Sequence, residues 1–180
     1  MQLQLDPRFA ALLTPGCFHP HTVHNLPVVD REGGAKEAGI ALLLNLHRRR
    51  WREADLGPSL VPDRLVMEAA RWSSGIVREF LTLVTDTGKA ALREGRAEAI
   101  DADLKLAVRE RRHTMEITVD AGSLAVLGEV YRTQHRPETA ADELLLGNAI
   151  VCYQNESVWY YPNQLLVPYV VSSLEGRREA

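Results

Sequence analysis

The sequence predicts a mainly α-helical protein with one small β-hairpin near its C-terminus. Between residues 35 and 112, helix-forming residues predominate and apolar residues recur at helical spacing. After residue 149, two short runs rich in Val, Tyr and Trp flank an Asn-Glu-Ser turn. The 180 residues, 46% of them hydrophobic, are enough to fill one ordinary core or two small ones. We expect three segments, a loop-rich start over 1–34, a helical bundle over 35–112 and a mixed unit over 113–180.

The N-terminal segment is rich in Pro, Gly and His, which exclude a long helix and leave one short strand near 26–29. It lacks the basic head and cleavage site of a signal peptide, and no apolar run in the chain approaches the roughly 20 residues that span a bilayer. Cys17 and Cys152 are the only cysteines and lie far apart, so no disulfide framework is expected. These features favour a cytoplasmic protein without membrane association.

Two helices are expected before residue 75. The first covers 35–52, and its apolar face has the spacing i, i+3, i+4, i+7 through Ile40, Leu43, Leu44 and His47. Pro62 suits the first turn of the second helix, which ends near Ser74.

Two further helices complete the bundle. The third extends from Gly75 to about Arg93 and has a wide apolar face. The fourth begins with Asp101 as N-cap and ends near Arg112, where the helix dipole favours cations. Its predicted inner side contains Leu104, Leu106 and Val108.

The break Ser73-Ser74-Gly75 is followed three residues later by Arg78, in the first turn of the third helix. A cation at that position opposes the helix dipole and costs about 1 kcal/mol or less on an exposed helix. We therefore interpret Arg78 as a residue that meets an anion.

The C-terminal segment has the element order of a winged-helix unit. A helix over 123–135 and a shorter one over 137–148 precede the hairpin, and a last helix, broken near Pro168, follows it. Strand alternation directs Trp159 and Tyr161 to one face of the hairpin and Tyr160 to the other.

Residues 62–112 resemble the helical lid of bacterial AAA+ and STAND-type P-loop ATPases. The resemblance is carried by the small-residue break, the arginine, the apolar helix and the segment that caps the last helix. Residues 141–170 resemble the winged-helix domain that follows the lid in many of these proteins. In that family the arginine after the break is the sensor-2 residue, which reaches the γ-phosphate of ATP. The resemblance implies this nucleotide-sensing role for Arg78.

The chain also departs from the family pattern. Ser74-Gly75-Ile76 replaces the usual paired glycine, and no segment matches the phosphate loop G-x-x-x-x-G-K-[ST]. We therefore expect the isolated chain to be no enzyme and to need no cofactor, with ATP and Mg²⁺ bound only if it is joined to a nucleotide-binding core. Two alternatives stay open, the C-terminal part of a larger ATPase or a stand-alone relative; the loop-like N-terminus favours the first.

The expected function is regulatory, with nucleotide state sensed at Arg78 and passed to protein partners. The helix before the hairpin is acidic and the turn contains Glu156, so both would be repelled by phosphate. We therefore predict that the winged helix binds proteins, with Trp159, Tyr160 and Tyr161 as its candidate contacts.

Two alternative functions rest on other residues. The run HRRRWR, containing Arg48, Arg49, Arg50 and Arg52, combines guanidinium groups with an aromatic ring and would suit nucleic acid. The loop with Cys17, His19, His21 and His24 has zinc-type ligands and would suit a metal-dependent enzyme, although no second cluster completes a site. We interpret His47, His113 and His135 as cations near helix ends.

Overall fold

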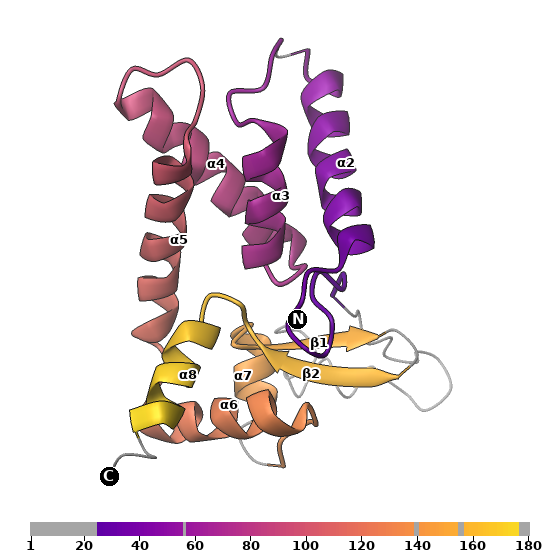
Figure 1. The fold of residues 1–180 in the computed structure, drawn as a ribbon, viewed down its shortest axis with the longest axis vertical. Helices are drawn as coiled ribbons and strands as arrows, with labels where there is room; N and C mark the ends of the chain where they lie inside the picture. Colours follow the sequence, from indigo (N-terminus) through magenta and orange to yellow (C-terminus); the bar gives the residue numbers. More distant parts are fainter. Residues whose placement is uncertain (1–24, 56, 139–140, 155–156, 177–180) are drawn as a thin grey trace, which may run out of the picture.

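The computed structural model describes residues 25–55, 57–138, 141–154 and 157–176, which form two parts stacked end to end (Figure 1). The first part contains four helices, as expected: α2 (Glu37–Glu53), α3 (Asp63–Trp72), α4 (Val77–Arg93) and α5 (Asp101–Glu116). Phe80 and Leu83 of α4 are buried, and α4 packs on both α3 and α5. The breaks near Pro62 and Gly75 lie where they were predicted, but α5 extends to Glu116, beyond the predicted end near Arg112.

The start of α5 differs by one residue from the prediction. Ile100 is the N-cap residue and Asp101 already lies inside the helix. The capping carboxylate belongs to Asp103, whose Oδ2 accepts a hydrogen bond from the Ile100 N–H at 2.9 Å. An acid at the third helical position accepts from the N–H of the N-cap residue, whereas an N-cap acid would accept from an N–H inside the first turn.

The second part contains the remaining elements, α6 (Ala121–Thr133), α7 (Ala141–Leu146), β1 (Ile150–Gln154), β2 (Val158–Pro162) and α8 (Val167–Gly176). The strands pair antiparallel with Ile150 opposite Pro162 and Gln154 opposite Val158, which confirms the predicted hairpin. The predicted break at Pro168 is wrong. Pro168 lies in the first turn of α8, where a missing N–H removes no helical hydrogen bond.

The predicted alternation on β2 is confirmed. Trp159 and Tyr161 are 1% and 5% exposed and face the core, whereas Tyr160 is half-buried on the opposite side. On β1, Tyr153 is paired with Trp159, and the two ring centroids lie 4.7 Å apart. The hairpin is thus anchored by an aromatic cluster.

The predicted strand over 26–29 is replaced by two isolated bridges. Asn25 bridges Tyr153 in parallel and its N–H donates to the Cys152 carbonyl at 3.0 Å, while Val29 bridges Ala35. Pro27 has no N–H to donate, so a continuous ladder cannot form between them. The segment nevertheless adds to the edge of the hairpin.

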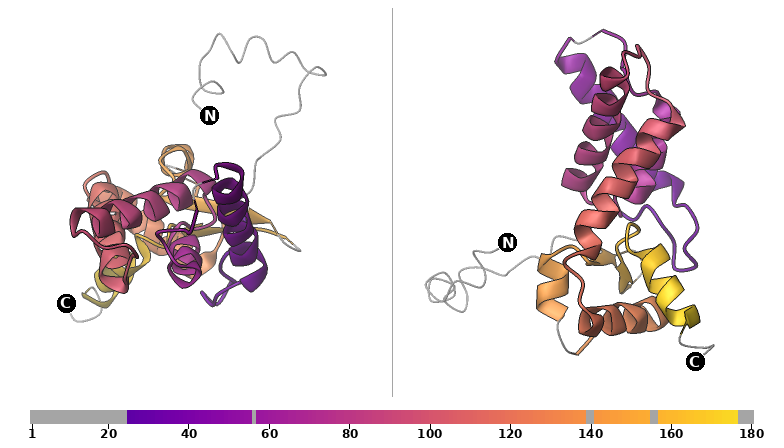
Figure 2. Two further views of the ribbon diagram at one scale, coloured as in Figure 1. Left: turned by 90° about the horizontal axis from the view of Figure 1, so that it is seen from above. Right: turned by 90° about the vertical axis from the view of Figure 1, so that its left-hand side faces the viewer.

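Buried apolar residues form one continuous cluster through both parts, from Val28 and Ile40 to Val170. The right-hand view of Figure 2 shows the α2–α5 helices on one side of the junction and the hairpin with α6 and α8 on the other. Among the described helices, none combines the length and the apolar composition needed to cross a membrane. The described chain is therefore mainly helical, with a two-stranded antiparallel sheet.

Candidate functional site

The turn between α3 and α4 has an unusual backbone. Ser74 and Gly75 both have positive φ, 55° and 72°. A Cβ on Gly75 would lie 1.8 Å from the carbonyl oxygen of Leu26, so only glycine fits there. Ser73 caps the end of α3, since its Oγ donates to the Ala70 carbonyl at 2.7 Å and accepts from the Gly75 N–H at 3.2 Å.

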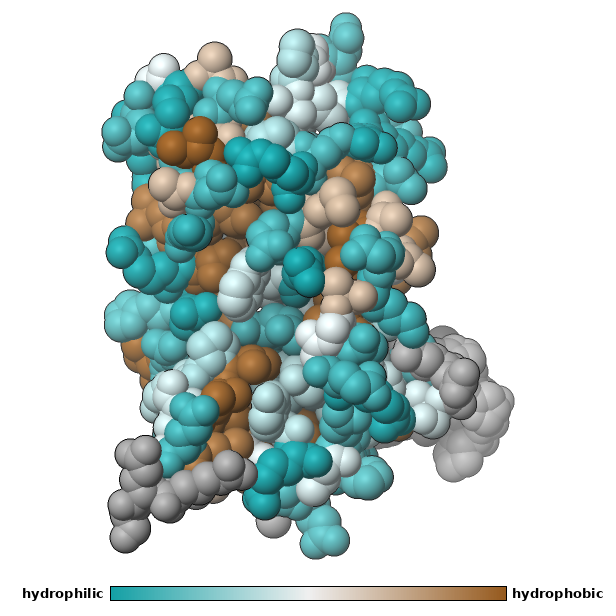
Figure 3. All heavy atoms as spheres, in the orientation of Figure 1, coloured by the Kyte–Doolittle hydropathy of each residue, from teal (hydrophilic) through white to brown (hydrophobic). Residues whose placement is uncertain are grey.

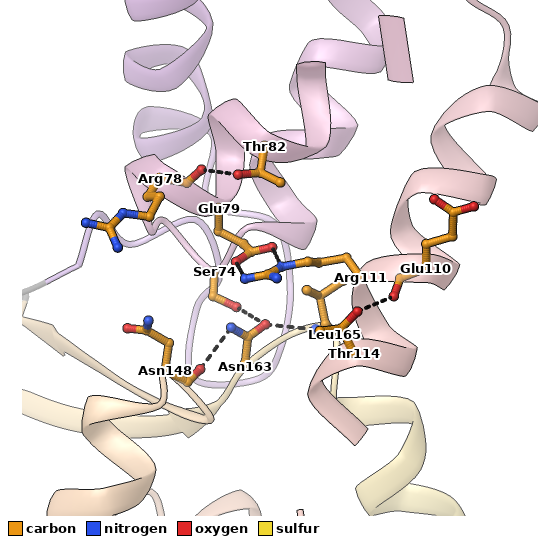
Figure 4. A network of polar contacts seen from close by, with 10 residues as sticks. All are labelled: Ser74, Arg78, Glu79, Thr82, Glu110, Arg111, Thr114, Asn148, Asn163 and Leu165. Atoms are coloured by element: carbon orange, nitrogen blue, oxygen red, sulfur yellow. Dashed lines mark hydrogen bonds and ion pairs between the residues drawn. The ribbon is translucent and has the colours of Figure 1, made fainter. Parts of the chain in front are cut away.

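The Ser74 side chain joins the two parts of the molecule (Figure 4). It is fully buried, its Oγ donates to Asn163 Oδ1 at 3.2 Å, and it accepts from the Gln164 N–H at 2.7 Å. The Tyr153 hydroxyl donates to the Ser74 carbonyl at 2.9 Å. The sequence explains Ser74 as a turn residue. Its side chain, however, bonds to Asn163, which lies 89 residues further along the chain.

Asn163 completes this junction, and the sequence contains no signal for it. Its amide Nδ2 donates to the Asn148 carbonyl at 3.0 Å, and its Oδ1 also accepts from the Leu165 N–H at 3.0 Å. The residue is fully buried just after β2. One side chain therefore connects the α3–α4 turn, the end of α7 and the entry to α8.

The first turn of α4 contains the oppositely charged neighbours Arg78 and Glu79, which face different sides of the helix. Glu79 faces inward, is 5% exposed, and forms two bonds with Arg111 of α5, at 2.5 Å and 2.8 Å. The hydrogen bond with Glu79 raises the pKa of Arg111 above its ordinary value. α4 is thereby held against α5 at its first turn.

Arg78 lies in the first turn of α4, as predicted. It is exposed, and its guanidinium points away from the Glu79–Arg111 pair (Figure 4). Within the described parts of the chain, no acidic side chain pairs with it. It lines a hollow of about 490 Å³ on the outer side of α4, together with Val77, Leu81, Thr82, Thr85, Asp86 and Lys89. The hollow has space for a ligand beside this cation.

A second hollow of about 490 Å³ continues along α4 toward α2. It shares Leu81, Thr85 and Lys89 with the first. Trp51 lies on its α2 side and Leu92, which is 63% exposed, lies at its far end. We call the surface from Val77 to Leu92 the outer face of α4.

The arginines of the run HRRRWR do not form one free basic patch. Arg48 is ion-paired with Asp63, and Arg49 with Glu53 at 2.7 Å. Arg50 and Arg52 are exposed and have no ion pair with any described residue. Trp51 donates from Nε1 to the Gly57 carbonyl at 2.8 Å, so its ring edge is engaged within the protein.

His47 is not a helix-end cation. It is 6% exposed inside α2, and its Nε2 lies 3.2 Å from Ser59 Oγ. Burial lowers the pKa of His47, because the charged imidazole would lose its hydration. The interpretation as a dipole partner was wrong for this residue because the apolar face of the helix includes it.

The three candidate aromatic contacts have different accessibility. Trp159 lies beneath the Arg31 guanidinium, 5.5 Å from its ring centroid, and Tyr161 packs on Tyr131. Burial raises the pKa of Tyr161 to about 12. Trp159 and Tyr161 are therefore core residues, and only Tyr160 offers part of its side chain to a partner.

The metal hypothesis concerns residues that are not described. Cys17, His19, His21 and His24 lie outside the described residues. Within the ranges that are described, no three His, Cys, Asp or Glu side chains are grouped to hold a metal ion.

Comparison of the chain with protein-family models, with curated proteins and with solved structures found no match.

Proposed function

We propose that the chain is a regulatory module of a P-loop ATPase. In this proposal α2–α5 act as the lid over a nucleotide-binding core, Arg78 follows the γ-phosphate of ATP, and the C-terminal part acts as a winged helix that binds a protein partner. The observation that carries the proposal is the exposed Arg78 beside a rigid buried turn, without an acidic partner among the described residues.

The stability of α4 does not account for this arginine. A cation in the first turn is unfavourable by about 1 kcal/mol or less, and the adjacent Glu79 is engaged by Arg111. A phosphate beside Arg78 would accept a charge-assisted hydrogen bond from the guanidinium, and this bond would offset the unfavourable interaction with the helix dipole. The two neighbouring side chains thus have separate roles, one toward the core and one toward a ligand.

The outer face of α4 supplies a surface for the core to contact. Val77 is 41% exposed at one end and Leu92 is 63% exposed at the other, with the two hollows between them. Burial of such apolar surface would hold the lid on the core at about 25 cal/mol per Å². Arg78 lies at the end of this face, so contact with the core would bring it close to bound nucleotide.

The buried junction gives a route from Arg78 to the partner-binding part. Ser74 lies four residues before Arg78 and is bonded to Asn163 and Gln164. A rotation of α4 on nucleotide hydrolysis would therefore displace the hairpin and α8 with it.

The charge of the C-terminal part favours a protein partner over DNA. Glu138 and Glu143 are exposed, and Asp142 of α7 is ion-paired with Arg136 at 2.7 Å. A recognition helix in the major groove needs donors or basic residues on its outer side. α7 offers acids instead, and Tyr160 on β2 adds a half-buried aromatic contact.

The test needs the ATPase core, which the gene neighbourhood should reveal as a P-loop sequence in the same or an adjacent reading frame. ATP turnover by the core with this chain is measured for wild type, Arg78→Ala and the control Arg93→Ala, an exposed arginine at the other end of α4. We expect Arg78→Ala to reduce nucleotide-dependent turnover about 10²-fold or more, while Arg93→Ala retains it.

Thermal unfolding of the same three chains separates function from stability. Arg78→Ala should unfold within a few degrees of wild type. A mutant that unfolds early yet supports normal ATP turnover would show that Arg78 is structural. Salt-sensitive DNA binding that is lost on Arg50→Ala with Arg52→Ala would favour the nucleic-acid alternative instead.

A further inference from the structure

A groove separates α3 from α5 on the side of the bundle away from α4. α4 packs on both helices, whereas α3 and α5 meet each other less closely and leave a hollow of about 580 Å³. Hydrophobic side chains are visible over this part of the surface, between α5 and α3, surrounded by hydrophilic ones (Figure 3). The floor is apolar and consists of Leu65, Leu104, Val108 and the half-buried Trp72.

Most charges along the groove already have partners. Arg64 is ion-paired with Asp101 at 2.6 Å, and Glu68 with Arg71 at 3.5 Å. Arg112 stacks on Trp72 and donates to the Leu165 carbonyl at 3.0 Å. These contacts belong to the fold.

Lys105 and Arg109 are the exception. Both line the groove on α5, both are exposed, and neither forms an ion pair with any residue in the described ranges. They are four residues apart, so their side chains are neighbours on one helix face, where like charges destabilise a helix by about 0.2–0.5 kcal/mol. Asp101 lies four residues before Lys105 on the same helix face but is engaged by Arg64, so the two cations are left at the groove.

We propose that the α3–α5 groove binds an amphipathic helix of a partner protein whose acidic side chains pair with Lys105 and Arg109. The apolar side of that helix would lie on Trp72 and the groove floor. α3 has 10 residues and is about 15 Å long, so the groove matches two to three turns of a bound helix. Apolar anchors at i, i+3, i+4 and i+7 would reach the floor, as in other helix-in-groove complexes.

The lining favours a peptide over nucleic acid. Glu68 of α3 and Asp101 at the start of α5 stand on the groove and would repel a phosphate backbone along its length, whereas a helix can place its acids opposite Lys105 and Arg109 alone. The groove lies away from the outer face of α4, so this partner and the proposed ATPase core have separate surfaces.

The test uses the full chain and two designed peptides of about 14 residues. As a helix, each peptide is long enough to extend past both ends of the groove. Both carry Leu at i, i+3, i+4 and i+7; one has Glu at the flanking positions and the other has Lys. Binding is measured by fluorescence polarisation, and the site is located from amide chemical-shift changes. We expect the Glu peptide to bind wild type about tenfold more tightly than the Lys peptide, with shifts confined to α3 and α5.

Charge reversal provides the decisive comparison. Lys105→Glu with Arg109→Glu should invert the preference, so that the Lys peptide binds more tightly. The control Arg50→Glu with Arg52→Glu makes the same change in net charge on α2 and should leave the preference unchanged. Circular dichroism confirms that each variant is folded.

Three outcomes would overturn the proposal. The first is the absence of Glu-peptide binding below about 1 mM. The second is a preference that the α5 reversal does not invert. The third is binding of a random single-stranded DNA that is lost on the same reversal, because this would identify a polyanion site instead.

Discussion

Gly75 occupies a backbone position that the tertiary structure requires to be glycine. Its φ is positive, and the Leu26 carbonyl fills the space where a Cβ would lie. Gly95 also has a positive φ, 67°, but nothing lies within 4 Å of its Cβ direction. A side chain at Gly75 would meet both backbone strain and a steric clash, whereas one at Gly95 would meet strain alone.

Gly75→Ala should lower the free energy of unfolding by about 4 kcal/mol or more, because strain and clash act together. Gly95→Ala, which adds strain alone, should cost about 1 kcal/mol. Urea unfolding monitored by circular dichroism measures both. Equal losses would show that the Leu26 contact adjusts without cost.

His47 should make stability depend on pH. Its pKa is lowered by burial in the folded state, so the unfolded chain takes up the proton first as pH falls below about 6.5. Stability is then fully present above that pH and decreases toward the lower folded-state pKa.

His47→Gln should reduce the change in the free energy of unfolding with pH over the range from about pH 7.5 to about pH 5, which brackets the ordinary His pKa of roughly 6.5. Urea unfolding at a series of pH values measures this change. An unaltered slope in the His47 variant would contradict the assignment.

At the scale of elements, α4 and α5 are joined by the Glu79–Arg111 pair. Glu79 is 5% exposed, and 38% of the Arg111 side chain is in solvent. Removing one partner leaves a buried charge without compensation, whereas replacing both by apolar residues removes the requirement for a partner.

Arg111→Met should cost about 3 kcal/mol, at the lower end for buried pairs because the arginine is partly exposed. Glu79→Leu combined with Arg111→Met should recover most of this loss. Chemical denaturation of the single and double variants tests the pair, with Arg93→Met as an exposed control. A double variant as unstable as the single one would show that the loss came from packing of the arginine stem.

The whole molecule should unfold as one unit, because the Ser74–Asn163 contact is buried and the apolar cluster crosses the junction. Trp51 lies in the first part and Trp159 in the second, so each reports on its own part. With fluorotryptophan incorporated, the separate fluorine NMR signals of Trp51 and Trp159 should have coincident urea midpoints within one and the same chain.

Asn163→Ala should disturb this cooperativity. It leaves the Ser74 hydroxyl and the Leu165 N–H without their acceptor, at about 1–3 kcal/mol for each buried group. We expect the two tryptophan midpoints to separate in this variant. Ser172→Ala, on the exposed side of α8, is the control and should keep them together.

The elements of this protein could be predicted from its sequence because their signals are local. Helical periodicity predicts α2 through α5, proline at position 62 and glycine at position 75 mark their breaks, and β-prone runs predict the hairpin. The position of Arg78 in the first turn of α4 followed from the break before it, whereas its exposure did not, because Glu79 in the same turn is buried. The same local reading failed for Pro168, because a proline in a first turn and a helix break have similar sequence patterns.

Local sequence patterns are enough to specify the helical class, the hairpin and the alternation of Trp159 and Tyr161 on β2. The packing of the helices specifies the remaining contacts: Ser74 meets Asn163, Glu79 pairs with Arg111, and Lys105 and Arg109 have no ion pair with any described residue. Helix and strand patterns arise from interactions within a few residues, so a short stretch of sequence is enough to recognise them. Contacts between residues 32 or 89 positions apart depend on how whole helices pack, which no local pattern encodes.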